Sequence, residues 1–155
     1  MNDLQPLIAL LGQTEGERDR ALALSQQLDA ESRHAQAQAE QLLAYRGDYE
    51  KRWSQHFGRE GKIELVHCYQ GFTGRLNQAI EQQEHATRGA ASRAAEAAVA
   101  LREHEIRVAS VRKLIERRVQ ELRRAADVRE QKQSDEFAAR LAWQRLSNFG
   151  SLSAR

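Results

Sequence analysis

Few residues of this chain combine the side-chain type and the spacing that catalysis or metal binding requires. None of the 5 histidines has metal-ligand spacing to another, and the single cysteine, Cys68, adjoins only His67. Gly58, Gly61 and Lys62 form only part of a phosphate-binding loop, because the second glycine comes too early and no Ser or Thr follows the lysine. We therefore predict that the chain is not an enzyme and binds no metal or cofactor.

The composition favours long helices over a globular core. Of the 155 residues, 41% are hydrophobic, 30% are charged and 6% are aromatic, and much of the hydrophobic share is alanine, which buries little area. The 24 Lys and Arg residues are interspersed with 22 Asp and Glu residues, so the formal charge of +2 requires no nucleic-acid partner. A single cysteine and the lack of a secretory signal or membrane-spanning stretch predict a cytoplasmic protein, soluble or peripheral.

The breakers in the sequence divide it into two helices. Pro6 suits the first turn of a helix over about residues 4–55, and Gly58 and Gly61 suit a reversal over about 56–62. A second helix should run over about 63–146, with a Ser- and Gly-rich frayed tail at 148–155. The prediction is an all-α fold, in which residues 1–155 form a single domain: a long antiparallel coiled-coil hairpin of two helices.

A seven-residue count supports the coiled coil, because a sustained heptad period gives each helix one narrow apolar stripe. In the first helix the two rows are Leu7, Thr14, Ala21, Leu28, Ala35, Leu42, Tyr49 and Leu4, Leu11, Arg18, Ser25, Ser32, Ala39, Arg46, Trp53. In the second helix they are Val66, Thr73, Ile80, Thr87, Ala94, Leu101, Val108, Ile115, Leu122 and Tyr69, Leu76, Gln83, Ala90, Ala97, His104, Val111. We call these four sets the seam rows.

Unequal helix lengths predict an overhang. Folding at the turn pairs residues whose numbers add to roughly 118 to 122, so residues beyond about 118 have no partner in the first helix. This stretch still contains Phe137, Leu141 and Trp143, and uncovered apolar residues on a helix are candidates for docking another protein.

Two matched quartets lie on either side of the turn, both with the spacing i, i+4, i+7 and i+11. They are Gln38, Leu42, Tyr45 and Tyr49 in the first helix, and Phe72, Leu76, Ala79 and Gln83 in the second. The numbers of opposite members always add to 121, as for Tyr49 and Phe72, so the hairpin should bring the stripes side by side. These residues either pack the hairpin or offer partly exposed aromatic rings to a partner.

The same block carries a resemblance to the FliJ family of the flagellar type III export apparatus. It resembles that family in Leu42, Tyr45, Arg46 and Tyr49, then in Tyr69, Phe72, Leu76, Ala79, Ile80, Gln82 and Gln83 after the turn. The resemblance implies a non-enzymatic cytoplasmic stalk that links the hexameric FliI-type export ATPase to the cytoplasmic domain of the gate protein FlhA and supports delivery by export chaperones. Such a protein would lie at the cytoplasmic face of the inner membrane at the flagellar base, touching the membrane only through the gate.

The resemblance also implies two sets of partner contacts. The gate contacts would be the two quartets: Gln38, Leu42, Tyr45, Tyr49, Phe72, Leu76, Ala79 and Gln83. The overhang and the beginning of the chain would enter the ATPase ring, with candidate contacts in the basic stretch 112–129 at Arg117, Arg118, Leu122 and Arg124. Two alternatives stay open, namely the equivalent stalk of a virulence-type secretion system and a basic coiled coil that binds nucleic acid.

Overall fold

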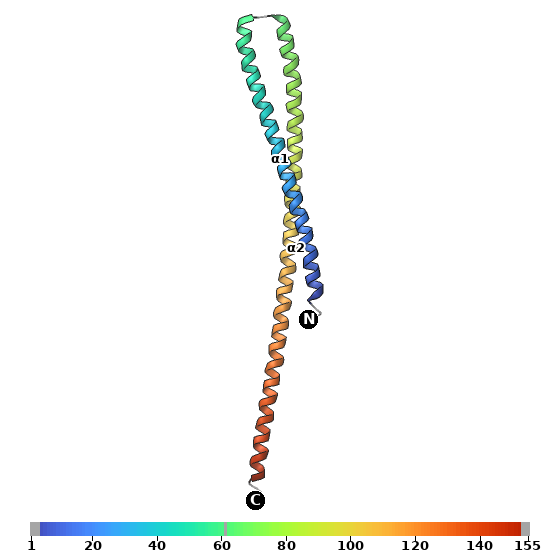
Figure 1. Ribbon diagram of the computed structural model, residues 1–155, viewed down its shortest axis with the longest axis vertical. Helices are drawn as coiled ribbons and strands as arrows, with labels where there is room; N and C mark the ends of the chain where they lie inside the picture. Colours follow the sequence, from blue (N-terminus) through green and yellow to red (C-terminus); the bar gives the residue numbers. More distant parts are fainter. Residues whose placement is uncertain (1–3, 61, 153–155) are drawn as a thin grey trace. The chain divides into compact units, whose positions relative to one another are not determined.

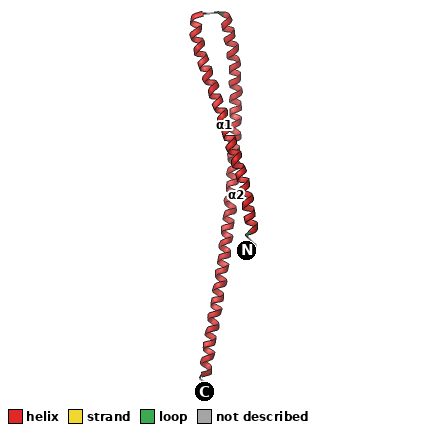
Figure 2. Cartoon of the chain, in the orientation of Figure 1, coloured by secondary structure: helices red, strands yellow, loops and turns green. Residues whose placement is uncertain are grey.

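Two long helices make up the structure. The computed structural model describes residues 4–60 and 62–152, in which α1 spans Gln5–Glu60 and α2 spans Ile63–Leu152 (Figures 1 and 2). No strand occurs in this described part of the chain. The predicted all-α class and the two-helix hairpin are therefore confirmed.

The start of α1 follows from Pro6. Gln5 is the first helical residue and Pro6 lies in the first turn, where a missing N–H leaves no intrahelical bond unmade. The carbonyl of Leu4 accepts a hydrogen bond from the backbone N–H of Ile8 at 2.9 Å, which closes that turn.

The reversal is shorter than the predicted stretch 56–62. The first helix does not end near residue 55 but continues through Gly58 to Glu60, and α2 begins at Ile63. One glycine costs a helix only about 1 kcal/mol, which a helix of this length absorbs. At the start of α2 the N–H of Val66 donates to the carbonyl of Lys62 at 3.4 Å. Gly61, also expected in the turn, lies outside the described residues.

The end of α2 also differs from the prediction. The helix does not stop near residue 146 with a frayed tail from 148, but continues to Leu152. The hydroxyls of Ser147 and Ser151 donate to the carbonyls of Gln144 and Asn148, at 3.0 and 2.9 Å. Such bonds from a serine hydroxyl to a carbonyl of the preceding turn pair the polar side chain while the residue stays in the helix. Residues 153–155 of the expected tail lie outside the described part.

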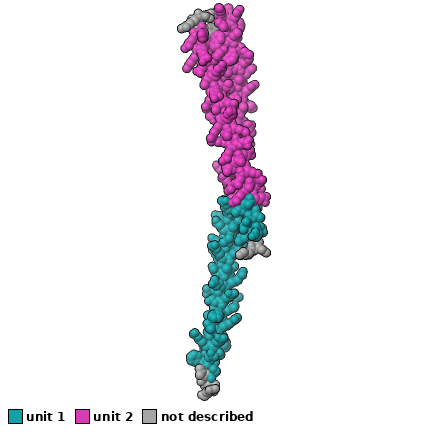
Figure 3. Space-filling model, in the orientation of Figure 1, with its two compact units in different colours: residues 1–12, 109–155 teal, residues 13–108 magenta. Residues whose placement is uncertain are grey.

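The chain divides into two compact units (Figure 3). One comprises Gln13–Val108, and we call it the hairpin unit; the other comprises Met1–Gly12 and Ala109–Arg155, and we call it the terminal unit. The prediction that the whole chain is a single domain stays a prediction.

The hairpin unit packs along the predicted seam. All members of the four seam rows within it are buried or half-buried, and the most buried are Ile80, Ala90 and Val108. Each cross-helix contact joins residues whose numbers add to between 117 and 123, as for Glu17 with His104 and Arg46 with Asn77. The antiparallel pairing and its register are therefore close to those that folding at the turn predicts.

The seam changes in composition along the hairpin unit. Its middle consists of small residues, including Ser25 and Ser32 of α1 and Ala90 and Ala97 of α2, which allow close approach of two helices. Near the turn the seam positions are filled by aromatic rings instead. Large side chains at a helix contact require a larger interaxial distance than small ones.

In the terminal unit the covered part of α2 is short. Leu4, Leu7 and Leu11 of α1 are half-buried, and Val111 of α2 is buried. The half-buried positions of α2 end at Leu122, about one turn beyond the predicted limit near 118, because helical side chains lean towards the N-terminus of their helix. All residues from 123 to 151 are exposed, as the predicted overhang requires. No described helix is long and apolar enough to span a membrane.

Val108 and Val99 provide a matched test of the seam. Val108 is 2% exposed and Val99 is 59% exposed, and both lie on α2 within the hairpin unit. Val108→Ala removes two buried methyl groups and should lower the free energy of unfolding by about 1.5 to 2 kcal/mol relative to Val99→Ala. Urea unfolding followed by far-UV circular dichroism measures the difference. Equal effects of the two substitutions would contradict the proposed seam.

Candidate functional site

Among the side chains that the structure describes, five aromatic rings gather near the turn of the hairpin unit, and we call them the aromatic cluster. Tyr45, Tyr49 and Trp53 come from α1, and Tyr69 and Phe72 come from α2. Tyr49 is central: its ring centroid lies 4.5 Å from that of Phe72, 5.7 Å from Tyr69, 6.0 Å from Trp53 and 6.3 Å from Tyr45. Aromatic pairs at these separations contribute about 0.5–1.5 kcal/mol each beyond their area burial.

Within the cluster only Tyr45 is exposed. Its side chain is 51% exposed, whereas the other four rings are half-buried. Tyr45 meets Phe72 edge to face with centroids 6.4 Å apart, and Trp53 and Tyr69 pack at 5.0 Å beneath the turn. The cluster thus presents one tyrosine to solvent on a base of packed rings.

Trp53 and Tyr69 were not among the predicted site residues. Both already lay in the seam rows, and their numbers add to 122, which places them opposite one another. The pair Trp53 and Tyr69 lies one layer closer to the turn than the pair Tyr49 and Phe72. The rule that the numbers of opposite residues add to about 121 therefore also predicts that these two rings join the cluster.

The predicted gate residues separate into surface and interior. Gln38 and Tyr45 are exposed, Leu42, Tyr49, Phe72, Ala79 and Gln83 are half-buried, and Leu76 is buried at 7% exposure. The structure therefore brings all eight into one region of the hairpin unit, but it leaves only part of the set accessible to a partner. Leu76 belongs to the core of the seam.

Polar bonds cross the seam beside this cluster. The side-chain amide of Gln83 donates to the backbone carbonyl of Ala35 at 3.0 Å and to the Gln38 side-chain oxygen at 3.4 Å. The Thr87 hydroxyl lies 3.2 Å from the same carbonyl oxygen of Ala35 and 2.7 Å from the carbonyl of Gln83. Gln83 is thus engaged within the hairpin rather than directed at solvent.

One seam hydroxyl is not satisfied. The Thr73 side-chain oxygen is buried and has no hydrogen-bond partner among the described residues. A buried hydroxyl without a partner costs about 1–3 kcal/mol. Thr73 lies next to the aromatic cluster in sequence, and packing of the rings dominates that layer.

The second predicted set of contacts lies on α2 in the terminal unit. Arg117 and Arg124 are exposed, and Arg118 and Leu122 are half-buried. The Arg118 guanidinium forms an ion pair with Glu121 at 2.9 Å, one turn further along the same helix. Only Arg117 and Arg124 thus stand fully at the surface.

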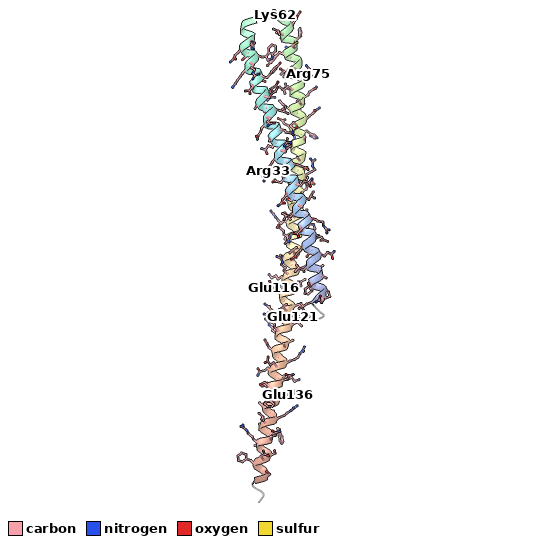
Figure 4. All side chains as sticks on the ribbon, viewed as in Figure 1. Arg33, Lys62, Arg75, Glu116, Glu121 and Glu136 are labelled. Atoms are coloured by element: carbon pink, nitrogen blue, oxygen red, sulfur yellow. The ribbon has the colours of Figure 1, made fainter. Side chains whose placement is uncertain are left out.

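The end of α2 carries aromatic residues that the predicted contact set left out. Phe137, Trp143 and Phe149 are 64%, 75% and 75% exposed. They are spaced six residues apart, so at about 100° per residue they project in three directions roughly 120° apart. Figure 4 shows side chains on both edges of the ribbon in this part of α2. Phe149 is not among the residues that the sequence predicts for docking, because it lies in the stretch 148–155 that is expected to be frayed.

No group of three or more His, Cys, Asp or Glu side chains among the described residues could hold a metal ion. A shallow hollow near Asp127, Glu130, Gln131 and Ser134 is lined by residues of α2.

Comparison with known proteins gives one family. Residues 1–147 match the family described as Flagellar FliJ protein. No curated protein and no solved structure matched the chain. The match includes the aromatic cluster and both predicted contact sets, and it confirms the family that the block around the turn resembles.

Tyr49 and Tyr45 should differ sharply in their effect on stability. Tyr49→Ala removes the ring that touches four others and should lower the free energy of unfolding by about 3 kcal/mol. Tyr45→Ala removes an exposed ring with two ring contacts and should cost only about 1 kcal/mol. Thermal and urea unfolding of the two variants provide the comparison, and a larger loss in Tyr45→Ala would refute this description of the cluster.

Proposed function

This chain belongs to the FliJ family of flagellar proteins, and on that premise we propose that it is the stalk between the FliI-type export ATPase and the gate protein FlhA. Members of this family are non-catalytic components with a role in flagellar protein export. In our proposal the chain works in the cytoplasm at the inner membrane, which it reaches only through the gate. It also supports delivery of substrates by export chaperones.

The gate contact rests on one observation, the exposed Tyr45 ring held on packed aromatic rings. Binding energy at protein interfaces concentrates in a few anchors such as tyrosine, and an anchor that is already ordered loses little entropy on binding. The contact distances from Tyr45 to Tyr49 and to Phe72, 6.3 and 6.4 Å, fix its ring from both helices. The Tyr45 ring is thus already ordered in the free protein, before a partner binds.

The exposure of each predicted gate residue suggests whether it contacts the gate directly or supports the residues that do. Gln38 and Tyr45 would touch the gate directly, together with the accessible edges of Phe72 and Ala79. The remaining members support that surface from within the hairpin: Leu42, Tyr49, Leu76 and Gln83.

The ATPase contact is supported by the exposed end of α2. Apolar residues that project from a helix in several directions can all be covered only by a partner that surrounds the helix. Phe137, Trp143 and Phe149 therefore suit insertion into a central opening, as in a hexameric ring. Arg117 and Arg124 would meet acidic groups of that ring, with Arg118 and Leu122 close by. The match to flagellar proteins favours this assembly over the stalk of a virulence-type system.

Tyr45→Ala should weaken binding to the FlhA cytoplasmic domain about tenfold or more, since loss of an interface anchor costs roughly 2 kcal/mol. Calorimetry with the purified gate domain gives the dissociation constant. Leu43→Ala is the matched control, because Leu43 is 39% exposed, lies two residues away and faces the opposite flank of the seam.

Helicity of both variants should equal that of the parent chain. Phe72→Ala is a poorer probe, since Phe72 packs on Tyr49 at 4.5 Å and its loss would disturb the hairpin. Gate binding that is unchanged in Tyr45→Ala would refute the gate contact.

Charge reversal tests the ATPase contact. Arg117→Glu with Arg124→Glu should weaken binding to the assembled ATPase by about tenfold or more at low salt, with a smaller difference at high salt. Arg88→Glu with Arg102→Glu is the control, because both arginines are exposed on α2 within the hairpin unit. Cosedimentation with ATPase hexamers is the measurement. Equal loss in both double variants would show a general charge effect instead of a local contact.

A further inference from the structure

The middle of the seam does not specify its own register. Between Ser25 and Ala39 on α1, and between Thr87 and Ala97 on α2, the seam positions are mostly Ala, Ser and Thr. If one helix slid by seven residues, small side chains would again meet small side chains. Apolar packing in this stretch therefore distinguishes weakly between the observed register and a neighbouring one.

The sequence also provides a second place for the reversal. A register shifted by seven moves the centre of the turn by three or four residues, which is the spacing between Gly61 and Gly58. Both glycines tolerate the backbone of a tight turn. A hairpin reversing at Gly58 would keep every seam position in the seam, so its heptad pattern alone would not exclude it.

The Gln83 side chain is the group that depends on register. Its amide carries two N–H groups, which match its two acceptors, the Ala35 carbonyl at 3.0 Å and the Gln38 side-chain oxygen at 3.4 Å. Reaching a helix carbonyl from the side requires a small residue at that position. One heptad to either side of Ala35 the same row has Leu28 and Leu42, whose side chains would cover the carbonyl.

Register in turn decides whether the exposed aromatic surface exists. In the observed register Tyr45 lies beside Phe72, with ring centroids 6.4 Å apart. A shift by one heptad would place Tyr45 next to Leu65 or Ala79 instead. The supporting contact of Tyr49 with Phe72 would be lost in the same step.

We propose that Gln83, supported by Thr87, is a positioning residue that sets the register of the hairpin and so places Tyr45 beside Phe72. Gln83 then serves partner binding without touching the partner. The part of this proposal that concerns partner binding rests on the proposed gate function, whereas the part that concerns register stands on the cross-helix bonds alone. Contacts among the rings of the aromatic cluster, which lies nearer the turn than Gln83, favour the same register.

Disulfide cross-linking in the full chain tests the register. In a Cys68→Ser background, Ser25→Cys with Ala97→Cys joins residues of the observed layer, whose numbers add to 122. Ser25→Cys with Ala90→Cys reports the register shifted by one heptad. The parent chain should oxidise only the first pair, since the second is displaced by roughly 10 Å along α2.

Removing the hydrogen-bonding side chains of Gln83 and Thr87 should increase the fraction of molecules in the shifted register. Gln83→Leu with Thr87→Val keeps side-chain size but removes the Gln83 amide and the Thr87 hydroxyl from the seam, and it should raise oxidation of the second pair roughly tenfold. Gln82→Leu is the matched control, because Gln82 is exposed beside Gln83. Gln83→Leu alone is the milder variant if the double variant loses helicity. A cross-linking pattern identical to that of the parent chain would overturn the proposal.

Binding to the gate domain distinguishes a positioning role of Gln83 from direct contact between Gln83 and the partner. The Gln83→Leu, Thr87→Val variant should bind the FlhA cytoplasmic domain more weakly, and oxidising the Ser25→Cys, Ala97→Cys pair in it should restore parental affinity. Binding that stays weak when the register is locked would mean that Gln83 touches the partner, which overturns positioning. If the parent chain itself fails to bind the gate domain, the proposed function fails, while the cross-linking pattern still decides the register.

Discussion

The hairpin depends on one constraint: each of two helices can bury only one face, and only against the other. With no third element among the described residues, buried side chains are confined to the seam rows, and even Val108 and Ile80 keep some exposure. Such a seam encloses no cleft in which substrate could be held. The exposed rings and charges of the described residues lie on the flanks and ends of the helices, where they suit contacts with other components of flagellar protein export.

The same seam serves different purposes along its length. Small residues in the middle let the helices approach closely, and there a few polar bonds, above all from Gln83 to Ala35, provide the specificity that packing does not. Near the turn the aromatic cluster supplies both packing and an exposed anchor, since Tyr49 supports Tyr45 from beneath. The rings of the aromatic cluster thus stabilise the hairpin and, in our proposal, also contact the partner.

Periodic features were predictable from the sequence, whereas boundaries were not. All described seam positions from Leu4 to Leu122 are buried or half-buried, because a heptad repeat is a property of the chain itself. The ends of the helices near residues 60 and 152 were misjudged, because each depends on a few weak hydrogen bonds and on glycine or serine residues whose cost is small. Trp53 and Tyr69 lie in the seam rows and their numbers add to 122, so the sequence pairs them, and their contacts with Tyr49 then show that they form one cluster with it.

The sequence by itself determined the helical period, the unequal helices, the approximate place of the turn and the family to which the chain belongs. The tertiary structure alone decided how the aromatic rings pack on Tyr49 and that the Gln83 side chain reaches the backbone carbonyl of Ala35, whereas the seam rows already contained Leu76 and left Tyr45 out. The physical reason is distance along the chain. Burial and hydrogen bonding across the seam join residues such as Gln83 and Ala35, which are 48 positions apart, and no local pattern records whether two such side chains meet.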